Sequence, residues 1–176
     1  MPETTPGYAI ALAAAEMERH TAYVHKLATE LVETAPRTWR LELPVNTQLI
    51  NANQNIHYRR KAELIKALRN TAWATARQHK LPALQRAHIY YVIHPDTKTR
   101  RRDPGNWSPS AKAAVDGIVD AGILPDDNRD HLLGPDPRIG NPVKGGQLVL
   151  WITDLDSIHP DHLALLNPPA LPGATS

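Results

Sequence analysis

Two acidic segments of this chain have residue types that can hold a divalent metal ion. In "RRRDPGN", Asp103 follows three arginines, and in "PDDN" the acidic residues Asp126 and Asp127 are adjacent. A phosphodiester resists attack because its charge repels nucleophiles, and two divalent ions roughly 4 Å apart can neutralise that charge, activate a water molecule and stabilise the leaving oxygen. Carboxylates would hold these ions, while neighbouring basic residues would bind phosphate, namely Lys98, Arg100, Arg101 and Arg102. The residue types therefore favour metal-assisted phosphodiester hydrolysis.

Each acidic segment also has a purely structural interpretation. The run from Asp103 to Asn106 satisfies turn chemistry, with proline at the second position and glycine at the third. Residues 124–128 fit a polar connection between a helix and a strand. The combination of both segments with the basic run favours a catalytic site over two unrelated turns.

The composition limits the classes of protein and of metal site. A chain of 176 residues, 41% of them hydrophobic, is enough for one domain with appendages. Its net charge is +2 and its pI is about 9.0, so any attraction to nucleic acid must come from local clustering. The absence of cysteine excludes thiolate ligands and thiol nucleophiles, which leaves carboxylate or imidazole ligands. Oxygen ligands suit Mg²⁺, with Mn²⁺ as the alternative. No apolar run approaches the roughly 20 residues that span a bilayer, and no secretion signal is evident, so we expect a cytoplasmic protein without a membrane partner.

The first half of the chain predicts two helices and one strand. Residues 8–33 form an amphipathic pattern, and this helix either packs on the core of its own chain or contacts a second copy. Residues 38–43 alternate as a half-buried strand does, and the Asn-rich segment 44–58 is either a surface loop or a binding loop. Residues 59–79 predict a second helix, with Lys66 and Arg69 on a basic face that is either solvated or in contact with phosphate.

The second half predicts a strand, a helix and a hairpin. The run "RAHIYYVIHP" has strand composition, and the next helix has Ser108 as its N-cap, Pro109 in its first turn and Gly122 at its end. Its buried stripe leaves Lys112 and Asp116 on the opposite side, at a spacing that ordinary i, i+4 pairing also explains. A short strand, "RDHLL", and a hairpin, "PVKGGQLVLWIT", complete the order.

This order predicts an α+β domain with a small mixed β-sheet and helices on one face. We expect an N-terminal helical extension over residues 1–37, the main domain over 38–157 and a Pro-rich disordered tail over 158–176. If the strand before Asp103 and the strand after the next helix are neighbours, both acidic loops would lie at related edges of the sheet, and carboxylate oxygens that share a metal there would be about 4–6 Å apart.

At these residues the sequence resembles the RusA family of Holliday-junction resolvases, small endonucleases encoded by phages and prophages. The resemblance covers residues 38–155 and rests on "RRRDPGN", "AKAAVDGIVDAG", "PDDN" and "PVKGGQLVLWIT", which follow the order of that family's motifs. The segment "LPVNTQLINANQNIHYRRKAELIKALR" also resembles the family's Asn-containing loop and first helix. The resemblance implies the RusA-like α+β fold and a homodimer that nicks four-way DNA junctions symmetrically with magnesium, in the cytoplasm of a phage-infected or prophage-bearing bacterium.

The resemblance also implies roles for individual residues. Asp103 and Asp127 would be the primary metal ligands, with Asp126 beside them, Lys112 would orient water or stabilise phosphate charge, and Asp116 would be a secondary catalytic candidate. The predicted DNA contacts are Lys98, Arg100, Arg101, Arg102, Asn106, Lys66, Arg69 and Lys144.

The sequence departs from the family pattern at Gly105, which replaces a second aspartate. Three extra residues also separate Asn106 from Lys112. Either Asp96, Asp116 or Asp126 supplies the missing carboxylate, or the site holds one metal, or the protein binds junctions without cutting them. The last possibility makes a non-catalytic recombination accessory protein the alternative function.

Overall fold

A computed structural model describes residues 14–26, 35–96 and 103–158 of the chain. The chain divides into two compact units, Met1–Ala35 and Pro36–Ser176. The basic run with Lys98 and Arg100–Arg102, and the tail from His159, lie outside the described residues. No helix in the described part is both long enough and apolar enough to span a membrane.

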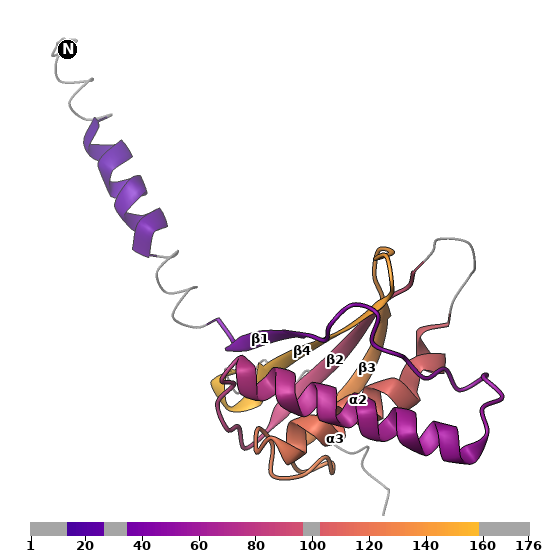
Figure 1. Cartoon of the computed structure of the whole chain (residues 1–176). Coiled ribbons are helices and arrows are strands. Elements are labelled where there is room, and N and C mark those ends of the chain that lie inside the picture. The colour runs from indigo at the N-terminus through magenta and orange to yellow at the C-terminus, as the bar shows by residue number, and fades with distance from the viewer. Residues whose placement is uncertain (1–13, 27–34, 97–102, 159–176) are drawn as a thin grey trace, which may run out of the picture. The chain divides into compact units, whose positions relative to one another are not determined.

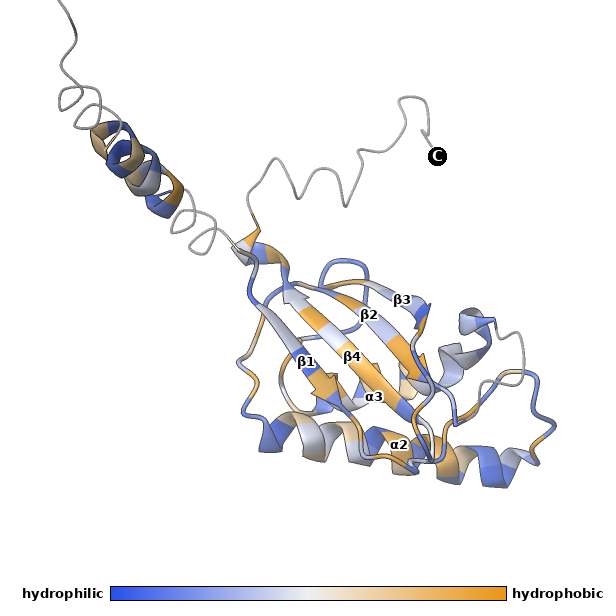
Figure 2. Ribbon diagram, turned by 90° about the horizontal axis from the view of Figure 1, so that it is seen from above, coloured by the Kyte–Doolittle hydropathy of each residue, from blue (hydrophilic) through white to orange (hydrophobic). Residues whose placement is uncertain are grey.

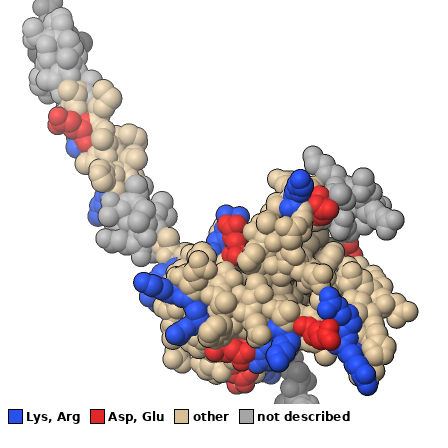
Figure 3. Space-filling view, viewed as in Figure 1, with Lys and Arg blue, Asp and Glu red and all other residues tan. Residues whose placement is uncertain are grey.

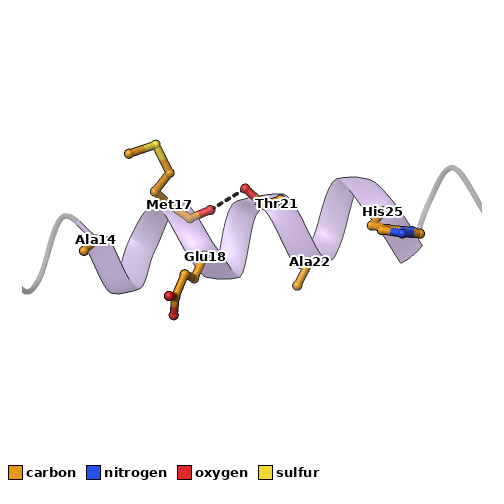
Figure 4. Close-up of a pocket in the computed structure, with 6 residues that line it drawn as sticks. All are labelled: Ala14, Met17, Glu18, Thr21, Ala22 and His25. Atoms are coloured by element: carbon orange, nitrogen blue, oxygen red, sulfur yellow. Dashed lines mark hydrogen bonds between the residues drawn. The ribbon is translucent and has the colours of Figure 1, made fainter.

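In the first unit, residues 14–26 are helical, as the sequence predicts, while the ends of the predicted helix fall outside the described part. Thr21 Oγ1 donates to the Met17 carbonyl at 2.8 Å, and Met17 and Glu18 point to different sides of the helix (Figure 4). Its large apolar side chains are exposed, including Met17 at 70% and Val24 at 50%.

The second unit is a mixed α+β domain whose four-stranded sheet is open (Figure 1). Its order along the chain is β1 (Thr38–Glu42), α2 (Tyr58–Gln78), β2 (Ala87–His94), a 3-10 turn η1 (Pro104–Trp107), α3 (Ser108–Asp120), β3 (Leu132–Ile139), β4 (Gln147–Asp154) and a 3-10 turn η2 (Leu155–Ser157). The strands lie in the order β1-β4-β2-β3, and only β2 and β3 are parallel. The predicted α+β class with a mixed sheet is confirmed.

Both α2 and α3 cover the same face of the sheet (Figures 1 and 2). Alternate residues of β2, from Ala87 to Ile93, are buried there with Leu41, Leu148, Leu150 and Ile152. The period-two pattern places one side of each strand on the helices, as expected for a sheet with one covered face. On α3 the predicted stripe is confirmed, with Ala111, Val115 and Ile118 fully buried and Val119 partly buried.

On the other face of the sheet, each strand contributes one group to a row of stacked side chains. The rings of Tyr90 on β2 and Trp151 on β4 are stacked, with centroids 5.8 Å apart and an interplanar angle of 10°. The guanidinium of Arg40 on β1 lies 5.8 Å from the Trp151 ring, and that of Arg138 on β3 lies 5.8 Å from the Tyr90 ring. Such pairs stabilise neighbouring strands across a sheet.

The structure corrects the predicted hairpin around Gly145 and Gly146. The segment before these glycines forms no strand, and β4 pairs with β1 and β2 instead. The predicted short strand at "RDHLL" is also wrong in its extent, because β3 begins at Leu132 and continues through Pro135 and Pro137 to Ile139. Proline is tolerated there because β3 is an edge strand, with β2 as its one neighbour in the sheet.

The predicted N-cap of α3 is also corrected. Trp107, not Ser108, occupies the N-cap position, because η1 runs directly into α3 and gives Ser108 helical dihedral angles, φ −50° and ψ −35°. The side chain that caps this helical run is Asp103, whose Oδ1 accepts a hydrogen bond from the Gly105 N–H at 2.9 Å. At the other end, Gly122 adopts a φ of 76°, the left-handed conformation expected of a residue that ends a helix.

Candidate functional site

Lys112, on the exposed side of α3, gathers two of the predicted carboxylates. Its Nζ donates to Asp116 Oδ1 at 2.5 Å, one helical turn further along α3, and also donates to Asp127 Oδ2. The first contact follows from the i, i+4 spacing, whereas the second joins residues 15 positions apart. We call Lys112, Asp116 and Asp127 the Lys112 cluster.

The loop after α3 is anchored in the core, and this anchoring positions Asp127. Ile123 and Leu124 are 3% and 2% exposed, and the Ile123 carbonyl accepts a hydrogen bond from the Leu84 N–H at 2.8 Å. Beyond them, Asp126 binds its own loop, since its Oδ1 accepts from the Asp127 N–H at 2.7 Å and its Oδ2 accepts from Asn128 Nδ2 at 2.8 Å. Asp126 therefore shapes the loop, and Asp127 is the aspartate that faces α3.

Arg69 of α2 extends the cluster into an ionic network between the two helices. Its Nη2 donates to Asp120 Oδ1 at 2.6 Å, its Nε donates to Asp120 Oδ2, and its Nη1 lies 4.0 Å from Asp116 Oδ2. The helices approach closely because position 117 is glycine: a Cβ there would lie 2.3 Å from the Arg69 carbonyl oxygen. Arg69, predicted to contact DNA, is thus engaged with Asp120 in this structure.

The charges in the Lys112 cluster stabilise one another. The hydrogen bond from Lys112 lowers the pKa of Asp127, and this effect outweighs the partial burial that would raise it. Partial burial acts to lower the pKa of Lys112, but its hydrogen bonds to Asp116 and Asp127, together with the charges of these two aspartates, outweigh burial and raise that pKa overall. At neutral pH Lys112 is therefore an ammonium ion that donates to the Asp127 carboxylate.

We predict that Asp127 makes stability depend on pH in the acid range. Its carboxylate has a lowered pKa in the folded protein, so its contribution is fully present above the unfolded pKa of about 3.9 and is lost as the pH falls through the folded pKa. The free energy of unfolding of wild type should exceed that of Asp127→Asn at pH 7. The difference should be at most about 1 kcal/mol, because the Lys112–Asp127 pair is partly exposed, and it should shrink below about pH 4. Urea unfolding of both proteins from pH 7 to pH 3 measures it. Asp130→Asn is the control, and a difference between wild type and Asp127→Asn that stays constant over this range would contradict the prediction.

The turn that contains Asp103 lies against the helix-covered face of the sheet. The Tyr91 hydroxyl donates to the Pro104 carbonyl at 2.9 Å, and the pKa of Tyr91 is raised by burial and further by the nearby charge of Asp103. The Asn106 carbonyl accepts from the Ala52 N–H at 2.7 Å, which joins the turn to the Asn-rich loop after β1. Asp103 is exposed at the start of this fixed turn.

The structure brings some predicted site residues together and leaves others apart. Lys112, Asp116 and Asp127 are in contact, whereas Asp103 bonds to its own turn. Within residues 14–26, 35–96 and 103–158, no group of three or more Asp, Glu or His side chains is placed to hold a metal ion. Parallel pairing of β2 and β3 puts the end of β2 and the start of β3 at opposite ends of the pair, so the strand ends themselves do not bring the two acidic loops together. The approach of Asp103 to Asp127 around a metal stays a prediction. Lys66 and Lys144 are exposed, and Asn106 is half-buried.

Two residues that position the site were not predicted. Tyr91 holds the Asp103 turn, and Ser110 is fully buried in α3, where its Oγ accepts from the Ile50 N–H at 2.6 Å and donates to the Ile50 carbonyl at 3.0 Å. Alternation along β2 places Tyr91 on the buried side with Ile89 and Ile93, and a buried tyrosine hydroxyl needs a partner. That signal identifies the tyrosine but does not identify its partner.

Comparison with known proteins found no protein-family model and no curated protein that matches the chain. The RusA resemblance therefore rests on the quoted sequence segments alone. The Lys112 cluster joins two of them, because Lys112 and Asp116 lie in "AKAAVDGIVDAG" and Asp127 lies in "PDDN".

Proposed function

We propose that this protein is a magnesium-dependent, structure-selective endonuclease that resolves four-way DNA junctions by symmetric phosphodiester hydrolysis. The observation that carries the proposal is the Lys112 cluster, in which two aspartates from separate motifs converge on one cationic group. A nuclease site needs carboxylates that share a cation and a basic group that meets phosphate.

The Lys112 cluster fits a magnesium ion in its donor chemistry. Mg²⁺ is commonly bound by one or two carboxylates, with waters and substrate phosphate completing its coordination. Asp116 and Asp127 would be the two carboxylates, and their convergence on the Lys112 ammonium supports a position where positive charge is stabilised. Bound magnesium would supply a Lewis acid and an acidified water molecule. Lys112 would then bind a phosphate oxygen, and Asp103 would act from the neighbouring turn.

DNA would meet the site through separate basic groups rather than one continuous basic surface. Basic and acidic side chains are interspersed on the face seen in Figure 3. We assign the phosphate contacts to exposed Lys66 and Lys144 and to the arginines of "RRRDPGN". A symmetric junction is most simply cut by a two-fold dimer, so we propose a homodimer that acts in the cytoplasm of a phage-infected or prophage-bearing bacterium.

Incubation of the purified protein with an end-labelled four-way junction tests the proposal. We expect paired nicks at symmetric positions with Mg²⁺ or Mn²⁺ and no nicks with a chelator. A linear duplex of the same sequence is the control, and it should remain uncut. Junction binding without cleavage under any divalent ion would reject the endonuclease.

The second candidate is a protein that binds junctions without cutting them. Two observations favour it: Gly105 in place of an aspartate, and no three-carboxylate group among the residues whose positions the structure gives. The junction assay separates the candidates, because both predict binding and the endonuclease alone predicts metal-dependent nicks.

We predict that Lys144→Gln weakens junction binding in a salt-dependent way. Lys144 lies in the exposed turn before β4, and a lysine that contacts phosphate releases a counterion on binding. The slope of log affinity against log salt should fall by about 1. The control is Arg86→Gln, the same change in charge just before β2, at the other end of the strand from the Lys144 turn. An unchanged slope would remove Lys144 from the DNA contacts, and little salt dependence in wild type would argue against DNA binding altogether.

A further inference from the structure

A small cavity at the C-terminal end of β2 gathers residues from three segments that the sequence analysis identified separately. Its walls include Thr47 and Leu49 from the Asn-rich loop, Trp107 from the Asp103 turn, and Gly145 and Gly146 from the turn before β4. The end of β2 contributes Ile93 to Asp96. The volume is about 190 Å³, below the roughly 300–1,000 Å³ of sites for drug-sized ligands, so the cavity suits a single ring system.

The cavity has apolar wall residues, the polar side chains of Thr47 and His94, and one acidic group at its edge. Leu49, Ile93 and Trp107 belong to the hydrophobic core or pack against it, so their positions are fixed. Asp96 is exposed, and its Oδ1 accepts a hydrogen bond from the Gly145 N–H at 2.6 Å, which orients the carboxylate. The other oxygen, Oδ2, is the acceptor that we assign to the ligand.

The glycine wall is bare backbone held by Asn46. The Asn46 N–H lies 3.2 Å from the Gly145 carbonyl oxygen and 3.3 Å from that of Gly146, and both glycines have positive φ, 87° and 68°. A Cβ at Gly145 would lie 2.1 Å from Asn46 Oδ1. The positive φ values disfavour side chains at both positions, and a Cβ at Gly146 would meet only ordinary contacts, at 3.6 Å or more, so a flat ligand can approach the Gly146 backbone.

We propose that this cavity receives one unpaired nucleobase that carries an exocyclic amino group. Aromatic and apolar walls hold the faces of a base, and a carboxylate accepts a hydrogen bond from an amino group such as that of cytosine. The same carboxylate repels phosphate, so the ligand enters with its base first. The inference rests on the proposed function for its source of bases, because bases at a branch point are more easily unstacked than those within a duplex. The cavity would make cleavage depend on the base next to the junction.

Binding of short single-stranded oligonucleotides to the full chain without divalent metal tests this proposal. Each oligonucleotide carries one base, A, C, G or T, in an otherwise abasic strand, and a fully abasic strand is the reference. We expect wild type to bind the strands with A, C or G about tenfold more tightly than those with T or no base, from one charge-assisted hydrogen bond. Thymine has only an N3–H between two carbonyl oxygens, and these oxygens repel the carboxylate. Equal binding of all strands, or no binding, would overturn the proposal.

Two variants connect the preference to the cavity. Asp96→Asn should lose the preference for amino-bearing bases, because its amide can also donate to the carbonyl groups of T, while Asp130→Asn should keep it. A base that contacts Trp107 should change the tryptophan emission, and Trp107→Phe should retain the base preference but lose this change. A preference that survives Asp96→Asn would reject the assignment of that carboxylate.

This test is independent of cleavage. Base preference in a protein that never nicks junctions would retain the cavity and reject the endonuclease. Magnesium-dependent nicking without any base preference would retain the endonuclease and reject the nucleobase cavity.

Discussion

Asp127→Asn is expected to abolish magnesium-dependent nicking of four-way junctions, with a loss of at least about a hundredfold in rate. Asp127 is the carboxylate that the loop after α3 brings to Lys112, and its amide replacement would bind a divalent ion poorly. A metal ion contributes several kcal/mol to stabilising the transition state, and about 1.4 kcal/mol corresponds to a tenfold change in rate. The measurement is single-turnover cleavage of a labelled junction with saturating protein.

Junction binding provides the check that Asp127→Asn remains folded. Its affinity in the absence of metal should equal or exceed that of wild type, because one negative charge has been removed. Asp130→Asn makes the same change three residues away and should cleave normally. Asp103→Asn keeps an oxygen that can cap the Gly105 N–H, so it tests the metal role of Asp103 with its turn preserved. Nicking that survives both Asp103→Asn and Asp127→Asn would reject the proposed site.

Gly117→Ala is expected to destabilise the domain by forcing α2 and α3 apart. An added Cβ would lie 2.3 Å from the Arg69 carbonyl oxygen, 2.9 Å from Ala72 Cβ and 3.0 Å from the Trp73 backbone nitrogen. Backbone atoms cannot move aside as a flexible side chain can, so α2 and α3 must separate. Overpacking of this kind costs roughly 1–3 kcal/mol. Urea denaturation at pH 7 measures the change in the free energy of unfolding.

The sign of this effect is informative because helix propensity opposes it. Alanine is favoured over glycine in a helix interior by about 1 kcal/mol, so a variant more stable than wild type would show that the helices are not in close contact. Gly122→Ala is the comparison: a Cβ there meets nothing within 4 Å, and the φ of 76° is its one source of strain. It should lose less stability than Gly117→Ala. An equal loss of stability in the two variants would indicate that the close approach of α2 and α3 at Gly117 does not cause the destabilisation.

The fold could be predicted wherever a local pattern determines burial. Alternation identified β1 and β4, composition identified β2, and the stripe of Ala111, Val115 and Ile118 identified the buried side of α3. In the strands and in the helix, the spacing of the apolar residues equals the geometric period of the element, so the pattern predicts which side faces the core. The same reasoning placed Lys112 and Asp116 together on the exposed side.

Errors arose where pairing between distant segments decides the result. The glycine pair before β4 has the composition of a hairpin turn, but β4 pairs with β1 and β2, and the turn instead meets the end of β2 through Asp96. Pro135 and Pro137 argue against a strand unless it lies at an edge, and the strand order that makes β3 an edge is not a local property.

The candidate site divides in the same way. The Lys112–Asp116 pair follows from helical spacing, whereas the contact of Lys112 with Asp127 depends on how Ile123 and Leu124 anchor the intervening loop. The cavity near Asp96 depends on three loops that the sequence places far apart. Residue types indicated the kind of chemistry, but only tertiary packing determines which carboxylates share a cation.

The position of β4 has a consequence for biosynthesis. This strand pairs with both β1 and β2, yet a ribosome makes it after both of them. A nascent chain that stops short of Gln147 therefore leaves β1 without its neighbour and exposes one edge of β2. Domains generally fold as units, and here the four-stranded sheet is complete only when β4 has emerged from the exit tunnel. Translation of the domain would thus pass through a chaperone-accessible stage that ends when β4 pairs with β1 and β2.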